Sequence, residues 1–323
     1  QDMEFKTEIL ENNDVMIDGQ FIGKINGLKL VLDLKKGALE TDIKSLKKAA
    51  RQSIGPELEK RIQIIIDTGL IELSNDFKIY WNDFPIAKLS SGHDYLNPNF
   101  ELIIDDIIEP TQKQKLTEYI NKWIQDKINL VLKSLVDLKN LKDKNSSIKA
   151  LAYQLYENNG VLKREQVSEY LKSLGQNERK ILRDLGVKFG RYHVFLYQLI
   201  KPEAVSLRTL LWKNFHQKYY NISPPTFGLN FLDDKEFRNK NFMLLCGFEK
   251  FDTMFVRIDI LERLFMLIIN LSNSKENKEI KIIPEMLNLL GCNKENFKKL
   301  LQKMNYKVFD KNEETFFKYN PIK

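Results

Sequence analysis

The sequence predicts an α+β fold that is mainly helical, with two N-terminal β-hairpin-plus-helix repeats followed by winged-helix-like helical domains. Two internal similarities lead to this prediction. In the first half, residues 15–33 align with residues 79–105, and in the second half, residues 164–189 resemble residues 284–309. The predicted domains are two hairpin-helix repeats (1–74 and 75–145), a basic winged-helix-like domain (146–230) and a C-terminal winged-helix-like domain (231–323).

The first-half repeat consists of alternating apolar residues around a short turn. The turn is Asp18-Gly19 in the first copy and Asn82-Asp83 in the second, and this pattern is typical of a β-hairpin. The alignment places Ile22, Lys24 and Ile25 on Ile86, Lys88 and Leu89. A long helix is expected after each hairpin, at about 40–68 and 110–140, because apolar residues recur there at three- and four-residue steps.

The second-half similarity predicts two short helices, joined by a glycine-containing turn and followed by a strand. Around the later copy, an opening helix at 259–271, a strand at 281–283 and a hairpin in "YKVFDKNEETFFKY" complete a winged helix-turn-helix pattern. In the earlier copy the hairpin falls within 186–202, with Gly190-Arg191 at its tip. A helix-turn-helix with a purely structural role is the alternative interpretation.

The bulk properties indicate a globular protein and are compatible with a polyanionic partner. The 323 residues are 43% hydrophobic and carry a formal charge of +7. Cys246 and Cys292 form no CxxC pair, so we expect a reducing, cytoplasmic compartment and no metal site. The longest apolar run, 264–269, is far shorter than the roughly 20 residues of a membrane span. The chain shows no signal peptide and begins with Gln, so we expect a piece of a larger protein with no membrane partner.

The sequence offers no catalytic motif. The stretch "GQFIGK" (19–24) is one residue too short between its glycines for a phosphate-binding loop, lacks the following Ser or Thr, and lies in a predicted hairpin. No DExH stretch is present, and the three histidines have no metal-ligand spacing. We therefore assign no catalytic residue. A free-standing enzyme whose site is scattered through the fold is the third and weakest hypothesis.

The most informative segment is basic and aromatic, and lies within residues 186–220. Cations neutralise phosphates and aromatic faces stack on unpaired bases, and proteins that bind single strands combine the two. The candidate nucleic-acid-binding residues are Lys188, Arg191, His193, Lys201, Arg208, Lys213, Arg257 and Arg263. The alternative is that the rings form core and the cations form a solvated face.

The last two candidates belong to "VRIDILERL" (256–264), where local interactions are a competing explanation for the charges. Asp259 and Glu262 have the spacing of a capping box, and Asp259 and Arg263 that of a favourable helical ion pair. Further on, Gly291 is expected to end a helix and Asn293 to cap the next.

Several stretches together resemble a known family. "LGVKFGRYHVFLYQLIKPEAVSLRTLLW" (185–212), "GFEKFDTMFVRIDILERL" (247–264) and "PEMLNLLGCNKENFKKLLQKMNYKV" (284–308) are similar to the C-terminal region of α-proteobacterial superfamily 2 helicases related to the mitochondrial RNA-degradosome helicase. "FIGKINGLKLVLDLKK" (21–36) and "WNDFPIAKLSSGHDYLNP" (81–98) resemble segments that follow the motor domains in those proteins, with less specific motifs.

The resemblance implies the non-motor C-terminal part of an ATP-dependent RNA helicase. ATP and Mg²⁺ would belong to the motor domains, whose motifs this chain lacks, so no cofactor is expected in this chain. The expected partners are RNA or single-stranded DNA and the motor domains of the same protein. A scaffold that docks the helicase to a partner such as a nuclease is the second hypothesis.

Overall fold

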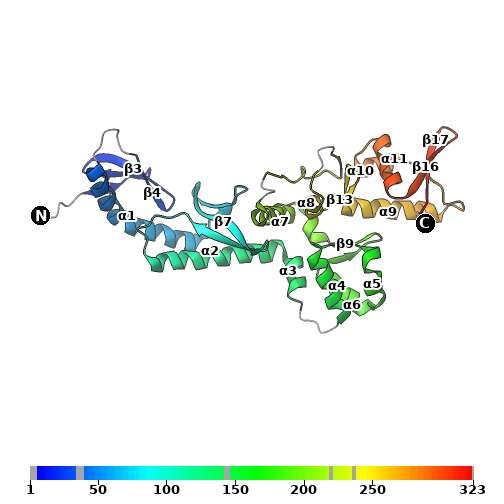
Figure 1. Ribbon diagram of the computed structural model, residues 1–323, viewed down its shortest axis with the longest axis horizontal. Coiled ribbons are helices and arrows are strands. Elements are labelled where there is room, and N and C mark those ends of the chain that lie inside the picture. Colours follow the sequence, from blue (N-terminus) through cyan, green and yellow to red (C-terminus); the bar gives the residue numbers. More distant parts are fainter. Residues whose placement is uncertain (1–5, 34–39, 142–145, 218–220, 235–237, 322–323) are drawn as a thin grey trace. The chain divides into compact units, whose positions relative to one another are not determined.

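The protein is described here by a computed structural model (Figure 1). It describes residues 6–33, 40–141, 146–217, 221–234 and 238–321. The chain forms two compact units. Unit 1 comprises residues 1–127 and 210–220, and unit 2 comprises residues 128–209 and 221–323. Both are mixed α and β structures with small antiparallel sheets, in agreement with the predicted fold class at this coarse level.

Unit 1 contains two four-stranded antiparallel sheets. The first has the order β1-β2-β3-β4, with β1 at Thr7–Ile9, β2 at Asp14–Ile17, β3 at Gln20–Asn26 and β4 at Lys29–Leu32. The second has the order β5-β6-β7-β8, with β5 at Glu72–Leu73, β6 at Lys78–Trp81, β7 at Phe84–Asp94 and β8 at Asn97–Leu102. Both central hairpins turn where expected, because φ is positive at both turn residues, Asp18-Gly19 and Asn82-Asp83.

The two sheets share their strand register. Asp14 faces Lys24 in the first sheet, and Lys78 faces Lys88 in the second, so both partners are shifted by the same 64 positions. Each hairpin also has one register irregularity, after Val15 in the first and after Ile79 in the second, again 64 positions apart. These paired positions agree with the alignment made from the sequence.

One long helix follows each sheet in the chain: α1 follows the first sheet and α2 follows the second. Helix α1 spans Glu40–Thr68, as predicted, and α2 spans Pro110–Val131, shorter than predicted because a separate helix, α3 at Lys133–Lys139, follows it. The buried side chains of α1 recur every three or four residues and include Ala50, Ile54, Leu58, Ile62 and Ile65. The helix contacts β1, β2 and β4 and so covers the first sheet.

Unit 2 contains three three-stranded antiparallel sheets and most of the short helices. Its first part comprises α4 (Ser146–Glu157), β9 (Val161–Lys163), η1 (Arg164–Val167), α5 (Ser168–Lys172), α6 (Gln176–Asp184), β10 (Val187–Phe189), β11 (His193–Leu196) and η2 (Tyr197–Ile200). Helix α7 (Pro202–Phe215) begins in unit 2 and ends in unit 1. The middle part comprises β12 (Phe231–Asp233), α8 (Lys240–Leu245), β13 (Phe248–Phe251) and β14 (Met254–Arg257). The last part comprises α9 (Ile258–Asn273), β15 (Ile280–Lys281), α10 (Pro284–Leu290), α11 (Lys294–Lys303), β16 (Tyr306–Lys311) and β17 (Glu314–Tyr319).

The first and last parts of unit 2 follow the same order of helices and strands. In each, a helix is followed by a strand, two short α-helices and a hairpin, and in the first part the 3₁₀ helix η1 directly precedes α5. The sheet orders also correspond, β10-β11-β9 in the first part and β15-β17-β16 in the last. The expected turn features are present as well, since Gly291 has φ of +70° at the end of α10 and the Asn293 side chain accepts the Asn296 N–H at 2.7 Å.

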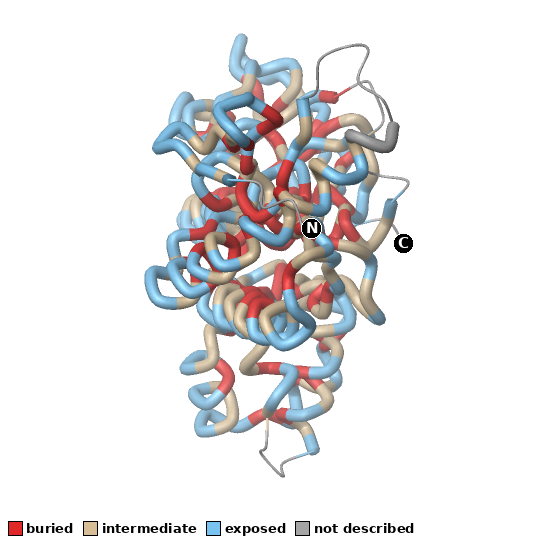
Figure 2. The backbone as a smooth tube through the Cα atoms, turned by 90° about the vertical axis from the view of Figure 1, so that its left-hand side faces the viewer, coloured by how far each residue is buried: buried red, intermediate tan, exposed pale blue. Residues whose placement is uncertain are grey.

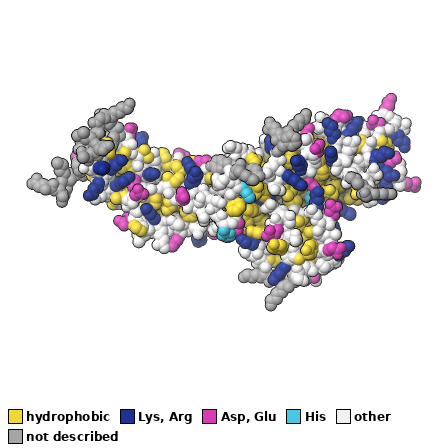
Figure 3. All heavy atoms as spheres, in the orientation of Figure 1, with side chains coloured by type: hydrophobic (Ala, Val, Ile, Leu, Met, Phe, Trp, Pro, Cys, Tyr) yellow, Lys and Arg dark blue, Asp and Glu magenta, His cyan; other side chains and the backbone are white. Residues whose placement is uncertain are grey.

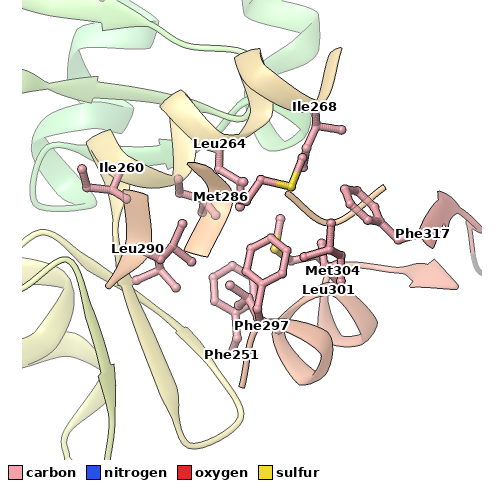
Figure 4. Packing of buried hydrophobic residues seen from close by; sticks show 14 of the residues in the cluster. Phe251, Ile260, Leu264, Ile268, Met286, Leu290, Phe297, Leu301, Met304 and Phe317 are labelled. Carbon is pink, nitrogen blue, oxygen red and sulfur yellow. The ribbon is translucent and has the colours of Figure 1, made fainter. Parts of the chain in front are cut away.

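The last part of unit 2 is built around one apolar cluster. Figure 4 shows Ile260, Leu264 and Ile268 of α9 pointing toward side chains from α10, α11 and β17. The other labelled members are Phe251, Met286, Leu290, Phe297, Leu301, Met304 and Phe317. Buried residues occur in both units, and Figure 2 marks buried residues in red along the chain. Burial of such side chains is the main stabilising contribution, at about 25 cal/mol for each Å² of apolar surface removed from water.

Candidate nucleic-acid interface

The hairpin formed by β10 and β11 borders a cavity of about 690 Å³ in unit 2. Four cations line it: Arg164, Lys188, Arg191 and Arg263. Phe189, Gly190, Asp259, Glu262 and Met266 complete the lining. The cations come from η1, β10, the hairpin tip and α9, so tertiary folding brings them together from three separate stretches of sequence.

The carboxylates of the cavity do not neutralise these cations. Asp259 accepts two hydrogen bonds from the Arg257 guanidinium, at 2.6 and 2.9 Å. Glu262 is engaged by backbone N–H groups of the hairpin. In the part of the chain that the structure describes, no carboxylate oxygen lies within 4.0 Å of a charged nitrogen of the four lining cations. The cavity therefore presents uncompensated positive charge.

A second hollow of about 410 Å³ extends this basic region. It shares Arg164 and Arg191 with the first and adds Lys172 and Arg179. The Arg179 guanidinium lies over the Phe189 ring at 5.6 Å, where the negative face of the ring stabilises the cation. The two hollows adjoin at the hairpin tip through Arg164 and Arg191, but Glu165 also lines the second hollow and Lys172 pairs with Glu169 at 3.6 Å.

The hairpin tip is held by one carboxylate. Glu262 of α9 accepts backbone N–H groups of Arg191 at 2.7 Å, Tyr192 at 3.0 Å and His193 at 2.6 Å. The His193 ring lies between Glu262 and Glu249, with Nδ1 3.1 Å from Glu262 and Nε2 hydrogen-bonded to Glu249. Lys163 of β9 reaches the same Glu249 at 3.4 Å. This network fixes the tip against β13 and α9, and with it the position of Arg191.

The protonation of this network follows from its surroundings. Burial lowers the pKa of His193, but the hydrogen bonds and charges of Glu249 and Glu262 together outweigh burial, so the pKa is raised above its usual value. Burial raises the pKa of Glu262, but His193 and the hairpin N–H groups outweigh it, so the pKa is lowered. His193 is therefore cationic and Glu262 anionic over the acidic side of neutrality.

The structure brings together four of the eight predicted residues. Lys188, Arg191 and Arg263 line the larger cavity. Lys201 lies near Lys188, because both ammonium groups lie over the Tyr197 ring, at 5.7 and 5.1 Å from its centroid. Arg257 is close to this group but is paired with Asp259, the structural role that the sequence left open.

The other three predicted residues lie elsewhere. Arg208, a candidate binding residue, is 1% exposed and donates to the carbonyls of Asn159 at 2.6 Å and Leu245 at 2.8 Å. His193 is equally buried, between Glu249 and Glu262. Lys213 belongs to unit 1 and lies over the Phe77 ring at 5.8 Å. These side chains are not part of the cationic surface of unit 2.

The predicted capping box in α9 is wrong. The helix begins at Ile258, so Asp259 is inside the first turn and pairs with Arg257, and Glu262 turns to the hairpin instead of the helix start. The expected pairing of Asp259 with Arg263 is replaced by this arrangement, and Arg263 faces the cavity. Asp259 thus has a different local partner, two residues away, and Glu262 has a partner that tertiary folding brings from 71 positions away.

Sequence reasoning missed two residues of this surface. Arg164 donates to the Gly190 carbonyl at 2.8 Å and lines both hollows. Tyr197 was one of several rings in the basic segment and only its exposure distinguishes it. Alternation gives no signal for Tyr197, because all four residues of the preceding strand β11 are buried, and no local pattern indicates that Arg164 approaches the hairpin.

Charge alone does not mark a binding face. On the face seen in Figure 3, cationic and acidic side chains lie interspersed. Among the described residues, no group of three or more His, Cys, Asp or Glu could hold a metal ion, and no helix has the length and apolar character of a membrane span.

No family model matches the chain, and neither a curated protein nor a solved structure is significantly similar to it.

Proposed function

We propose that unit 2 binds single-stranded nucleic acid, with RNA as the expected ligand, at the cationic cavity beside the β10–β11 hairpin. The observation that carries the proposal is the convergence of Arg164, Lys188, Arg191 and Arg263 on one cavity, where the described residues provide no carboxylate partner for them. Uncompensated cations in a concave site attract phosphate groups and release counterions when they bind them.

The wider proposal is that the chain is the non-motor C-terminal part of an ATP-dependent RNA helicase, where it binds or guides the strand. The sequence resemblance supports it, and the shared element order of the two parts of unit 2 supports a pair of winged-helix-like domains. The common strand register of the two sheets in unit 1 supports a duplicated hairpin-helix repeat. ATP hydrolysis would belong to the motor domains, so this chain is proposed as a binding region.

The test is a titration of a fluorescent single-stranded RNA with the 323-residue chain across a salt series. The wild type is expected to bind with an affinity that falls steeply with salt. The triple variant Lys188→Gln, Arg191→Gln, Arg263→Gln is expected to reduce the slope of log K against log salt by about 2, at roughly 0.7 for each phosphate that is no longer neutralised. The same titration with single-stranded DNA compares the affinities for ribose and deoxyribose strands.

A matched control neutralises three cations of unit 2 that line neither hollow. All three are exposed: Lys149 belongs to α4, Lys275 lies just after α9, and Lys307 belongs to β16. The variant with all three changed to Gln has the same net charge as the cavity variant and is expected to lose less affinity and less slope. Equal losses in the two variants would contradict a localised site, and no binding by the wild type would contradict the proposed function.

The alternative, a scaffold that docks a protein partner such as a nuclease, is favoured by one observation. Phe227 is 52% exposed and Leu229 41% exposed, and both line a small hollow with Pro224 and Pro225. Exposed apolar side chains that cluster are typical of protein contacts. If the wild type does not bind nucleic acid, this is the surface where we would first substitute Phe227.

A further inference from the structure

Tyr197 is an exposed aromatic ring between two lysines at the end of the hairpin. It is the first residue of η2, directly after β11, and is 43% exposed. The ammonium groups of Lys188 and Lys201 lie over its ring at 5.1 and 5.7 Å. Within the described part of the chain, its hydroxyl group has no hydrogen-bond partner. The ring also lies 6.5 Å from the Phe195 ring, in a tilted arrangement, so buried Phe195 and the two lysines both neighbour it.

The other rings of the segment are occupied. Phe195 is fully buried, and Tyr192 stacks on Phe265 at 4.7 Å, where burial raises the pKa of its hydroxyl to about 12. Phe189 lies beneath the guanidinium groups of Arg179 and Arg183, at 5.6 and 5.7 Å. Tyr197 also has cations over its ring, but it is the one ring between residues 186 and 202 that is exposed, and its neighbours are flexible lysines.

We infer that Tyr197 is a stacking site for one unpaired base of the bound strand, an inference that rests on the proposed function. Every base has a π-face that can stack on an aromatic ring without a demand on sequence. Lysine side chains are flexible, so Lys188 and Lys201 can leave the ring and contact the phosphates that flank the stacked base.

Lys188 links this stacking site to the cationic cavity. It lies over the Tyr197 ring and also lines the cavity with Arg191 and Arg263. A strand whose phosphates contact the cavity would therefore pass Tyr197 within the length of one lysine side chain. The two features contribute differently to affinity. The cavity attracts phosphates, and this contribution depends on salt. The ring stacks on a base, and this contribution does not depend on salt.

The test compares Tyr197→Ala and Tyr197→Phe in the full chain, with a fluorescent oligouridine of about 16 nucleotides, near the upper site size of small single-strand binders. Tyr197→Ala is expected to weaken binding by about 5- to 150-fold, the loss of one stacked base, without changing the salt slope. Tyr197→Phe keeps the ring and is expected to bind like the wild type. Tyr153→Ala, at a tyrosine of α4 that is 61% exposed, is the matched control and is expected to change nothing.

An oligonucleotide that lacks bases separates stacking from a structural role. Wild type and Tyr197→Ala are expected to bind this abasic strand with equal affinity, because neither can stack on it. If Tyr197→Ala weakens abasic binding as much as oligouridine binding, or weakens neither, the stacking inference is overturned while the proposed function stands. If the wild type binds neither strand, the proposed function fails first, and the inference fails with it.

Discussion

The His193 ring nitrogen Nδ1 lies 3.1 Å from Oε1 of Glu262, and the same carboxylate accepts the backbone N–H groups of residues 191, 192 and 193. Both side chains are almost fully buried. A carboxylate with this many donors is strongly stabilised as the anion. The pair therefore joins α9 to the tip of the β10–β11 hairpin and sets where Arg191 stands at the cavity.

The first prediction concerns pH. The raised pKa of His193 contributes stability that is complete below its unfolded value of about 6.5 and is lost as pH rises through the folded value. The lowered pKa of Glu262 contributes stability that is present above about 4.3 and is lost as pH falls through its folded value. We therefore expect the pair to stabilise unit 2 most between about pH 4.3 and pH 6.5. Its contribution to the free energy of unfolding is expected to be smaller near about pH 8.5.

His193→Gln measures this contribution. The free energy of unfolding at about pH 5.5, minus that at about pH 8.5, is expected to be smaller in the variant than in the wild type. Hydrogen exchange of the β11 amides measures the stability of unit 2 separately from that of unit 1. In the wild type, the NMR titration of the His193 ring supplies a second test, and a midpoint below about 6.5 would contradict the prediction.

The second prediction is that Gly190→Ala destabilises unit 2 by about 1–3 kcal/mol, the usual cost of overpacking. A methyl group on Gly190 would lie 2.5 Å from the Glu262 carboxylate, which cannot move without losing its hydrogen bonds to the hairpin. Urea unfolding followed by hydrogen exchange measures the change.

Gly175→Ala is the control for this position. Its methyl group would also meet a glutamate carboxylate, that of Glu178, at 2.7 Å. Among the described residues, the Glu178 side chain has no ion pair or hydrogen bond to hold it, so it can rotate away. We expect a cost below about 1 kcal/mol at this helix N-cap, and an equal cost at the two glycines would remove the role given to Glu262.

Local features of the fold were predictable from the sequence, and the centre of the site was not. Helix α1 ends where its periodicity ends, and the turns at Asp18-Gly19 and Asn82-Asp83 are determined by residues that tolerate positive φ. The burial of His193 by Glu249 and Glu262 depends on residues 56 and 69 positions away. No local pattern indicates such partners.

The largest error in the candidate site has a physical reason. An arginine without a charged neighbour in the sequence, as Arg208 is between Leu207 and Thr209, predicts an exposed cation, because buried arginines are rare unless they are paired. In α7 the guanidinium instead binds carbonyls at the ends of two other segments, Asn159 after α4 and Leu245 in α8. A buried cation that satisfies the backbone of other elements can be recognised only once those elements are placed.

The third prediction follows from this burial. Arg208→Met is expected to destabilise unit 2 by about 2–4 kcal/mol, because two buried carbonyls lose their donors at roughly 1–2 kcal/mol each. Folded Arg208→Met is expected to keep the salt slope of nucleic-acid binding. Arg263→Met is expected to change the free energy of unfolding by no more than about 0.5 kcal/mol. It is expected to reduce the salt slope of nucleic-acid binding. A reduced slope for Arg208→Met with wild-type stability would show that Arg208 contacts the strand after all.

The fourth prediction distinguishes the two sheets of unit 1. Gly23 of β3 faces Leu32, and Ala87 of β7, 64 positions later, faces Leu102. A methyl group on Gly23 would lie 2.2 Å from the Val31 carbonyl oxygen and 3.0 Å from the Leu32 Cα, and these backbone atoms cannot rotate away. Strands β3 and β4 must therefore move apart, and we expect Gly23→Ala to cost about 1–3 kcal/mol.

The matched variant for this prediction is Ala87→Gly, which is expected to cost only about 0.5–1 kcal/mol, mainly through added freedom of the unfolded chain. Tryptophan fluorescence during urea unfolding measures both, because Trp81, Trp123 and Trp212 all belong to unit 1. A neutral or stabilising Gly23→Ala would contradict the close approach of the Val31 carbonyl oxygen to Gly23.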